Sequence, residues 1–391
     1  MPKVLVACEL SDGSNPIHIL VPLIKGLVRK GFEPVLALRR IQEHGLLTGL
    51  DCKIIQAPFF TANKKRIIYT FADLLDLKGW SDPDFLELMT RAWRLILKAE
   101  SPDIVVGFHS PGLNMAARGL MPALSLGDGF HLPPPQSPLP VHVPGKKKVP
   151  PASLEAEKQA TTSMNHVCQT LGIPAPANLG QLLQADKAFV TGLAFLDPFA
   201  SKRKEPRVWG FDHRQLKEVA ASKGRGGYLV ILHSQDKRAR PIMDFLIRKS
   251  IPCQAFLPGI GPKSRQHLGQ RGVKLLSQPP LTFQDLAAYR GLIHHGGLLG
   301  ELAAAAGLPQ VLLPTDPAQA VQARLTQDAG LGLSIPRTQS RLAEAVAEKL
   351  KDFFFQGRYP QKAREMARCL RERSPRPTAE VVPHECLKML A

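Results

Sequence analysis

The sequence has few aromatic residues, no long apolar run and no closely spaced cysteine pair. Phe, Trp and Tyr make up only 6% of its 391 residues. A transmembrane helix needs about 18 consecutive apolar residues, and no apolar run is that long. The six cysteines are scattered without a CxxC pair, which disfavours a zinc site and indicates reduced thiols. The apolar run in the opening MPKVLVACEL is too short for a signal peptide, so we expect a cytoplasmic protein.

Acidic residues are also scarce: 33 Asp and Glu stand against 51 Lys and Arg, a net charge of +18. This excess predicts an anionic partner, which is a nucleotide diphosphate, an acidic lipid surface or a nucleic acid. The basic clusters have no interleaved aromatic residues that would stack on bases, which disfavours nucleic acid. Association with a membrane surface stays open beside a purely cytoplasmic location. The oligomeric state is also left open.

The first half of the chain alternates between strand and helix patterns. Residues 4–7 predict a strand, and residues 17–29 carry helical spacing, with Leu20, Leu23, Ile24 and Leu27 on one face. Further buried strands are predicted at 34–38, 103–107 and 123–126. This alternation predicts an α/β fold with a parallel sheet covered on both faces. Ligands of such sheets bind at the carboxyl ends of the strands.

A second α/β region follows a stretch rich in proline and charge at 196–208, which has the composition of a linker. Strands are predicted at 228–234, 254–257 and 273–276, and a helix after Phe283. We therefore expect a first domain over residues 1–200 and a second over residues 207–370.

The most informative segment is residues 291–319, GLIHHGGLLGELAAAAGLPQVLLPTDPAQ. An apolar run ends in His294-His295-Gly296-Gly297, an alanine-rich helix follows, and a second apolar run ends at Pro314. Free N–H groups and the helix dipole make such a turn an anion site. Glycine at a strand-to-helix turn is common in any α/β protein, but the paired imidazoles favour a phosphate site.

The same segment resembles the nucleotide-sugar signature of the family 1 glycosyltransferases of the GT-B fold, which include the UDP-glucuronosyltransferase-like enzymes and a bacterial subgroup. The signature runs H-G-G-x-G-T, a small-residue helix, A-G-V-P, a strand, Pro and an acid-Gln pair. His295-Gly296-Gly297, residues 306–309, Pro314 and Gln319 match it. The chain departs from the signature at Leu299-Gly300, which replaces Gly-Thr, and at Ala318, which replaces the acid; Asp316 lies two positions earlier.

The resemblance implies a GT-B fold, in which two Rossmann-like domains face each other across a cleft and residues 371–391 pack back on the first domain. It implies a nucleotide diphosphate sugar of the UDP or dTDP type as substrate, with no cofactor. No metal is expected either, since there is no DxD motif and imidazoles, helix dipole and basic side chains can neutralise the diphosphate. The expected donor-binding residues are Ser234, His294, His295, Gly296, Gly297, Gly300, Glu301 and Gln319, with Lys237 and Arg238 supplying charge.

The resemblance also reaches residues 4–38, 71–96 and 102–112, and there it reveals eroded catalytic positions. The catalytic base of the family, a His, falls on Pro16, and proline cannot accept a proton. The acid that orients this base in the bacterial subgroup falls on Phe108. We expect His109 as the first substitute and His18 as the second. Residue 18 lies two positions along a helix from residue 16, a rotation of about 200°, which points it elsewhere.

Gly127 to His131 follow a predicted strand, so Asp128 and His131 are placed for an acceptor or a substitute catalytic role; an Asx turn is the equally simple explanation. Residues 133–151, rich in proline, predict an exposed loop. We expect an inverting, metal-independent glycosyltransferase acting on a small-molecule or lipid-linked acceptor. The main alternative is a degenerate GT-B scaffold that binds a ligand or protein. A third is a nucleotide-sugar epimerase using His109, Asp128 and His131.

Overall fold

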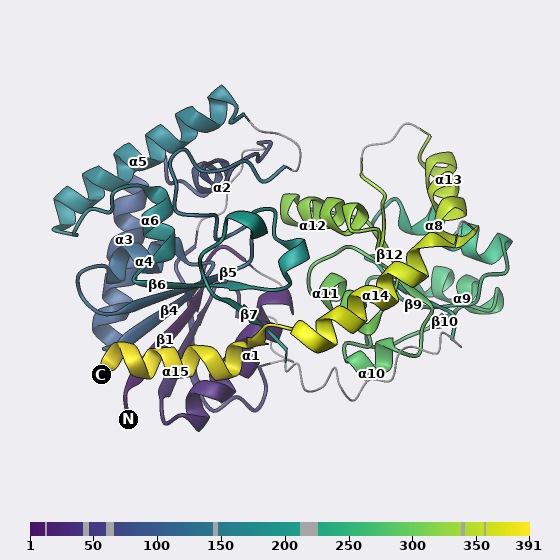
Figure 1. Ribbon diagram of the computed structural model, residues 1–391, viewed down its shortest axis with the longest axis horizontal. Helices are drawn as coiled ribbons and strands as arrows, with labels where there is room; N and C mark the ends of the chain where they lie inside the picture. Colours follow the sequence, from purple (N-terminus) through teal and green to yellow (C-terminus); the bar gives the residue numbers. More distant parts are fainter. Residues whose placement is uncertain are drawn as a thin grey trace. The chain divides into compact units, whose positions relative to one another are not determined.

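The chain forms two compact α/β units (Figure 1). The computed structural model describes residues 1–11, 14–41, 47–59, 66–143, 148–211, 226–337, 341–355 and 357–391. The first unit contains Met1–Phe211 together with Pro375–Ala391, and the second contains Asp212–Ser374. Each unit has its own sheet and its own hydrophobic core.

The sheet of the first unit has eight strands within the described residues, and every neighbouring pair is parallel. In sheet order the strands are β14 (Arg376–Pro377), β7 (Arg207–Trp209), β6 (Lys187–Thr191), β5 (Ala123–Gly127), β4 (Ile104–Phe108), β1 (Lys3–Cys8), β2 (Glu33–Leu38) and β3 (Lys53–Gln56). The central strands β5, β4 and β1 are almost continuously apolar, as a sheet covered on both faces requires.

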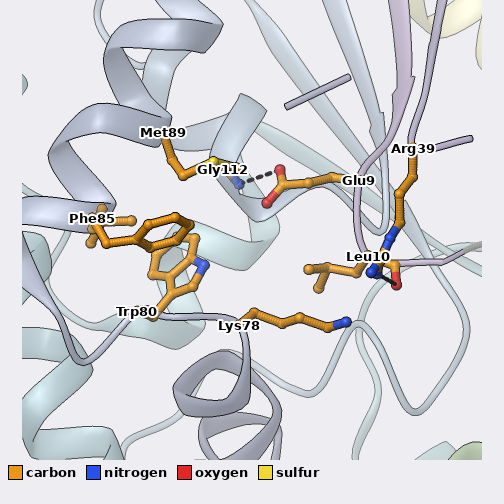
Figure 2. A pocket seen from close by; sticks show the side chains of 9 residues that line it. Glu9, Leu10, Arg39, Lys78, Trp80, Phe85, Met89 and Gly112 are labelled. Atoms are coloured by element: carbon orange, nitrogen blue, oxygen red, sulfur yellow. Dashed lines mark hydrogen bonds between the residues drawn. The ribbon is translucent and has the colours of Figure 1, made fainter. Parts of the chain in front are cut away.

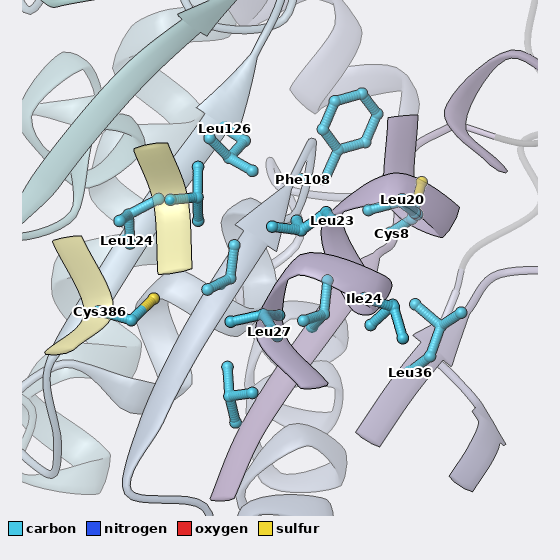
Figure 3. Packing of buried hydrophobic residues seen from close by; sticks show 14 of the residues in the cluster. Cys8, Leu20, Leu23, Ile24, Leu27, Leu36, Phe108, Leu124, Leu126 and Cys386 are labelled. Atoms are coloured by element: carbon cyan, nitrogen blue, oxygen red, sulfur yellow. The ribbon is translucent and has the colours of Figure 1, made fainter. Parts of the chain in front are cut away.

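Helices cover this sheet and follow the hydrophobic spacing of the sequence. They are α1 (Ser14–Arg29), α2 (Phe71–Leu77), α3 (Pro83–Glu100), α4 (Pro111–Ala117), α5 (Pro151–Leu171), α6 (Leu179–Gln184) and α15 (Thr378–Leu390), with short 3₁₀ turns η2 (Ala194–Leu196) and η3 (Ala200–Lys202). The predicted apolar face of α1 is confirmed, because Leu20, Leu23, Ile24 and Leu27 are fully buried. Figure 3 shows this face packed against residues of β4 and β5.

The C-terminal helix α15 lies against α1 in the first unit (Figure 1). The two helices approach so closely that a Cβ on Gly26 would collide with the carbonyl oxygen of Ala379. Val382 and Cys386 of α15 are buried in the same hydrophobic cluster as α1. The hydroxyl of Thr378 donates a hydrogen bond to the carbonyl of Trp209 at the end of β7. The last residues of the chain therefore complete the core that its first residues begin.

The second unit repeats the parallel α/β pattern, with six strands within the described residues. In sheet order they are β10 (Lys274–Leu275), β9 (Cys253–Phe256), β8 (Tyr228–Ile231), β11 (Gly291–His294), β12 (Gln310–Leu312) and β13 (Gly332–Ser334). The helices are α8 (Ala239–Arg248), α9 (Pro262–Gln270), α10 (Phe283–Leu286), α11 (Leu298–Ala306), α12 (Pro317–Asp328), α13 (Leu342–Phe355) and α14 (Arg358–Arg373). In the part of the chain that the structure describes, no helix has the length and apolar character to cross a membrane.

The predicted strands of both halves are confirmed, but the expectation of an exposed loop at 133–151 is wrong in part. Leu139 is fully buried and His142 is 1% exposed. The ring of His142 is hydrogen bonded to the carbonyl of Phe130, with 2.9 Å between Nε2 and the oxygen, and stacks on the Phe130 ring. Residues 144–147 lie outside the described residues. Proline content alone does not reveal that leucine and histidine side chains anchor this segment to the core.

Candidate functional site

The loops after β1, β4 and β5 bring four polar side chains together in the first unit. These strands are neighbours in the sheet, so their carboxyl ends meet at one edge. Ser11 follows β1, His109 follows β4, and Asp128 and His131 follow β5. This is the edge at which parallel α/β sheets bind their ligands.

His109 is held in an uncommon backbone conformation, with φ at +50°. A non-glycine residue in the left-handed region costs free energy and is frequent at functional sites. Its Nδ1 lies 2.6 Å from the Ser11 hydroxyl, and its Nε2 accepts a long hydrogen bond of 3.4 Å from the backbone N–H of Asp128. Burial, and next the charge of His131, lower the pKa of His109 well below its ordinary value. The ring is therefore neutral, with its proton on Nδ1 facing Ser11.

Asp128 and His131 form a hydrogen-bonded pair within one tight turn. The carboxylate Oδ1 of Asp128 accepts from the backbone N–H of Phe130, the backbone N–H of His131 and the ring Nδ1 of His131, each at 2.9 Å. Burial on its own would raise the pKa of Asp128, but the charge and hydrogen bonds of His131 outweigh it and lower that pKa. The Asp128 side chain keeps 42% of its surface exposed, so water screens part of this attraction. The Asx turn expected here is thus present, and the same carboxylate also pairs with the His131 ring.

The rings of His109 and His131 are stacked, with centroids 3.8 Å apart and planes at 16°. His109, Asp128 and His131 are the one group of three potential metal ligands found among the described residues. A metal ion lies in the plane of each imidazole that binds it, about 2.0–2.1 Å from the nitrogen for zinc. Two parallel rings separated by a stacking distance cannot both satisfy this condition for one ion. The arrangement fits proton transfer better than metal binding.

The other positions singled out in the sequence, Pro16, Phe108 and His18, add no acid or base to this cluster. Pro16 is buried in α1, and Phe108 is a core residue, 1% exposed, that stacks on the ring of His109. His18 is half-buried in α1, its Nε2 is buried without a hydrogen-bond partner, and desolvation lowers its pKa. No contact of His18 with His109 or Asp128 is found in the described residues, so the structure brings together His109 and Asp128 of the three predicted catalytic residues.

Glu9, which directly follows β1, lines a small cavity (Figure 2). Its carboxylate accepts a 2.9 Å hydrogen bond from the N–H of Gly112 in the first turn of α4. Burial raises the pKa of Glu9 to about 7, although the hydrogen bonds from Gly112 and Leu113 oppose the shift. The cavity of about 10 Å³ has room for about one water molecule, and both apolar side chains such as Trp80 and the basic side chains of Arg39 and Lys78 line it. Glu9 therefore ties the loop after β1 to the start of α4.

In the second unit, the glycine turn lies between β11 and α11 as the sequence predicts. Gly296 has φ at +117° and Gly297 at +69°, conformations that side chains rarely adopt. His294 is fully buried, its Nε2 is paired with Gln310 Oε1 at 3.0 Å, and its Nδ1 accepts from the N–H of Gly296. Burial lowers the pKa of His294 to about 4. His294 thus shapes the turn, and neither of its ring nitrogens is left to bind the phosphate of a nucleotide sugar.

His295 and the loop after β8 lie next to each other. The backbone N–H of His233 donates to His295 Nε2 at 3.0 Å, and His295 Nδ1 donates to the carbonyl of Leu313. The Ser234 hydroxyl donates to the carbonyl of Pro258 at 2.8 Å. Desolvation lowers the pKa of His295, although the nearby Asp236 opposes the shift. The expected phosphate-binding groups of Ser234 and His295 are therefore close to the turn, but each is hydrogen bonded within the protein.

The expectation that Arg238 supplies charge to a phosphate is wrong. Its guanidinium is 1% exposed and pairs with Asp236 at 2.6 Å. It also donates to the carbonyls of Leu313, Pro314 and Ile335, which end or follow β12 and β13. Arg238 therefore fixes the strand ends beneath the site.

Gln322 of α12 covers the glycine turn, a contact that the sequence motifs do not reveal. Its Oε1 accepts from the N–H of Gly297 at 2.5 Å, and its Nε2 donates to the carbonyl of Gly297 at 2.8 Å. A Cβ on Gly296 or on Gly300 would lie 2.8 Å from the Gln322 amide. The available signal was the spacing, because Gln322 follows Gln319 by three residues and so shares its face of the helix.

The remaining predicted donor residues also lie around this turn. Asp316 caps α12 by accepting from the N–H of Gln319, whose Oε1 accepts from the N–H and the hydroxyl of Thr315, both at 2.8 Å. Gly300 and Glu301 lie in the first turn of α11. The structure thus gathers the predicted donor residues at the carboxyl ends of β8, β11 and β12, which are adjacent in the sheet.

Comparison with known proteins agrees with this architecture. Residues 267–389 match the family described as erythromycin biosynthesis protein CIII-like, C-terminal domain. No curated protein matches the chain by sequence. Among solved structures, the glycosyltransferase VinC in complex with dTDP is 12% identical with a TM-score of 0.67, and 99% of each chain is covered.

Two further structures have the same fold over their full length. The calicheamicin glycosyltransferase CalG4 is 17% identical with a TM-score of 0.67, covering 100% of this chain and 98% of its own. The glycosyltransferase SnogD from Streptomyces nogalater is 14% identical with a TM-score of 0.62, and both chains are covered completely. The predicted GT-B fold and the resemblance to bacterial glycosyltransferases of this type are therefore confirmed.

Proposed function

We propose that this protein is a glycosyltransferase that moves a sugar from a nucleotide diphosphate of the dTDP or UDP type to an acceptor hydroxyl, by inversion and without a metal. One observation carries the proposal: a GT-B fold whose glycine turn lies at the carboxyl end of β11 and opens helix α11. The dTDP complex of VinC, a structure of the same fold, favours a dTDP sugar over other donors.

The proposed role of the turn is to hold the diphosphate. Backbone N–H groups at a helix N-terminus and the positive end of the helix dipole stabilise negative charge that grows on a leaving group. Because Gln322 occupies the N–H of Gly297, a phosphate oxygen that binds there has to replace its amide oxygen. Gln319, expected from the family signature to meet the sugar, lies beside Gly296.

The acceptor is proposed to bind in the first unit, at the cluster of Ser11, His109, Asp128 and His131. The relatives named above include a calicheamicin glycosyltransferase, which favours a small-molecule acceptor. A lipid-linked acceptor, and with it contact with a membrane surface, is the second possibility that the net charge of +18 favours. In either case we expect the reaction to take place in the cytoplasm.

The proposal is tested by a thermal-shift screen with dTDP, UDP, GDP and ADP, followed by calorimetry on each hit. The sugar conjugates of the best nucleotide are then incubated with a panel of hydroxyl acceptors, and nucleotide release is followed. Binding of dTDP or UDP with acceptor-dependent release supports a transferase. A protein that binds none of these nucleotides would refute the proposal.

A degenerate scaffold that binds a ligand or protein is the alternative, and one specific observation favours it. Pro16 and Phe108 occupy the positions of the family's base and its partner acid, and both are buried. Nucleotide binding with no release on any acceptor would favour this scaffold over the enzyme.

A further inference from the structure

We propose that His131 is the catalytic base of the transfer and that Asp128 is its positioning residue. This acid–base pair in the loop after β5 would replace the family's base and acid, whose positions hold Pro16 and Phe108. This inference rests on the proposed function. It assigns the proton transfer to a residue outside the family's positions, and it chooses between the roles that the sequence left open for Asp128 and His131.

The first argument is the tautomer of His131. Because Asp128 is ionised, its carboxylate can only accept hydrogen bonds, so the His131 Nδ1 that lies 2.9 Å away must carry the proton. Neutral His131 therefore has its lone pair on Nε2. This is the tautomer that a general base needs, and a buried or half-buried carboxylate on Nδ1 is the known way to hold it.

The second argument is access. The Nε2 atom of His131 makes no hydrogen bond within the described residues and is not among their buried unpaired polar atoms, so it meets solvent. The side chain as a whole is only 14% exposed. Phe71 and Phe130 flank the ring edge-on. A ring with one open nitrogen in an otherwise enclosed setting suits a proton transfer that must exclude bulk water.

The third argument excludes the neighbouring histidines. His109 Nε2 faces the N–H of Asp128, and its protonated Nδ1 faces Ser11, so neither nitrogen can take a proton from a substrate. The ring of His142 is hydrogen bonded to the carbonyl of Phe130, and burial lowers its pKa to about 4. Among the described residues, the titratable groups that act on His131 are His109, His142 and Asp128. Of the imidazoles of His109, His131 and His142, that of His131 alone is hydrogen bonded to a carboxylate there.

The stacked ring of His109 completes the arrangement. Two imidazolium rings with centroids 3.8 Å apart would repel each other, so the stack carries at most one positive charge. The lowered pKa of His109 keeps that ring neutral, and Asp128 stabilises the charge on His131. His109 has both this stacked ring and an uncommon backbone conformation, with φ at +50°.

The reaction balances as a single displacement. The acceptor O–H bond breaks and its proton passes to His131 Nε2, while the acceptor oxygen forms a bond to the anomeric carbon of the donor sugar. The bond between that carbon and the diphosphate oxygen breaks, and its electron pair leaves with the nucleotide diphosphate. His131 then returns its proton to solvent, and no oxidant or reductant is required.

The experiment compares two acceptors of similar shape, phenol and 4-nitrophenol, with dTDP-glucose and UDP-glucose as donors. Phenol needs a base at pH 7, whereas 4-nitrophenol is already partly ionised. We expect His131→Ala to lower nucleotide release with phenol by about 10²–10⁴-fold and with 4-nitrophenol far less. The exposed His166→Ala is the matched control and should behave as wild type. His131→Gln, which keeps a polar side chain of similar size, guards against misfolding of the alanine variant.

Asp128→Asn tests the positioning role with the same two acceptors. Asparagine can still accept from the backbone N–H groups but no longer holds the Nδ1–H tautomer of His131, so nucleotide release with phenol should fall while release with 4-nitrophenol changes far less. Equal losses with phenol and 4-nitrophenol in His131→Ala, or no loss in either, would overturn the inference and leave the proposed function standing. No binding of dTDP or UDP by the wild-type protein would instead refute the proposed function.

Discussion

Gln322 and Gly297 form two hydrogen bonds at the N-terminus of helix α11. The glutamine amide accepts from the glycine N–H at 2.5 Å and donates to the glycine carbonyl at 2.8 Å. The side chain comes from α12 and the glycine from the turn after β11. A single amide thus satisfies both backbone groups at the point where a diphosphate is proposed to bind.

These two hydrogen bonds predict the effect of Gln322→Glu on nucleotide affinity. A carboxylate cannot donate to the Gly297 carbonyl, and its charge repels a diphosphate that approaches the same N–H. We expect dTDP or UDP to bind at least about tenfold more weakly, which corresponds to about 1.4 kcal/mol. Calorimetry measures the affinity, with Gln322→Met as the variant that removes both hydrogen bonds without adding charge. Equal affinities of the glutamate variant and wild type would place the diphosphate away from Gly297.

Gly297→Val is expected to abolish nucleotide binding while the protein stays folded. Valine is strained at a φ of +69°, and its branched side chain would rotate the N–H groups of the turn. Gly269→Ala is a matched control, because a Cβ at that position in α9 meets no atom within 4 Å and its φ is not in the left-handed region. Normal affinity together with a normal melting temperature in Gly297→Val would show that the ligand binds elsewhere.

Glu9→Gln should change how the stability of the first unit depends on pH. A carboxyl group whose pKa rises from 4.5 unfolded to about 7 folded contributes stability that is fully present below pH 4.5 and is lost as the pH rises through about 7. The loss is on the order of 3 kcal/mol between these limits. Glutamine does not titrate, so the variant should lose less stability than wild type between pH 5 and pH 8.

Urea unfolding followed by tryptophan fluorescence measures this change, because Trp80, Trp93 and Trp209 are all buried in the first unit and are the three tryptophans of the chain. The exposed Glu155→Gln serves as the control and should follow wild type. Parallel pH profiles for wild type and Glu9→Gln would mean that Glu9 is not protonated in the folded protein near neutral pH.

Pro16→His is expected to restore part of the turnover that His131→Ala loses. The resemblance to the family puts a basic side chain at this position, and α1 is otherwise retained. The gain should be confined to acceptors such as phenol that require a base, measured as nucleotide release. A double variant no faster than His131→Ala would indicate that the side chain at position 16 no longer reaches the acceptor.

The sequence predicts the elements of the fold well because the hydrophobic period determines them locally. The four apolar positions of α1 and the short apolar runs of β1, β4 and β5 are all buried as expected. The position of the glycine turn is predictable for the same reason, since Gly296 and Gly297 are required by local backbone conformation.

Hydrogen-bond partners were less predictable because they depend on residues far apart in the chain. The imidazoles of His294 and His295 suggested a phosphate site. In the structure the His294 ring is instead hydrogen bonded to Gln310, and the His295 ring to the backbone of Leu313 and His233. Whether a histidine binds a ligand or supports a turn is decided by these distant partners. The tautomer that distinguishes His131 from His109 likewise depends on which carboxylate or N–H group each ring faces.

Helix α15 has a consequence for how the protein is made. The core under α1 includes side chains from residues 378–390, whereas the rest of that unit ends at Phe211. At about 5–20 residues per second, a ribosome takes on the order of ten seconds or more to produce the intervening chain, and α1 lacks its covering helix during that time. We therefore expect a fragment ending at Phe211 to aggregate, and the same fragment fused through a short linker to residues 375–391 to fold.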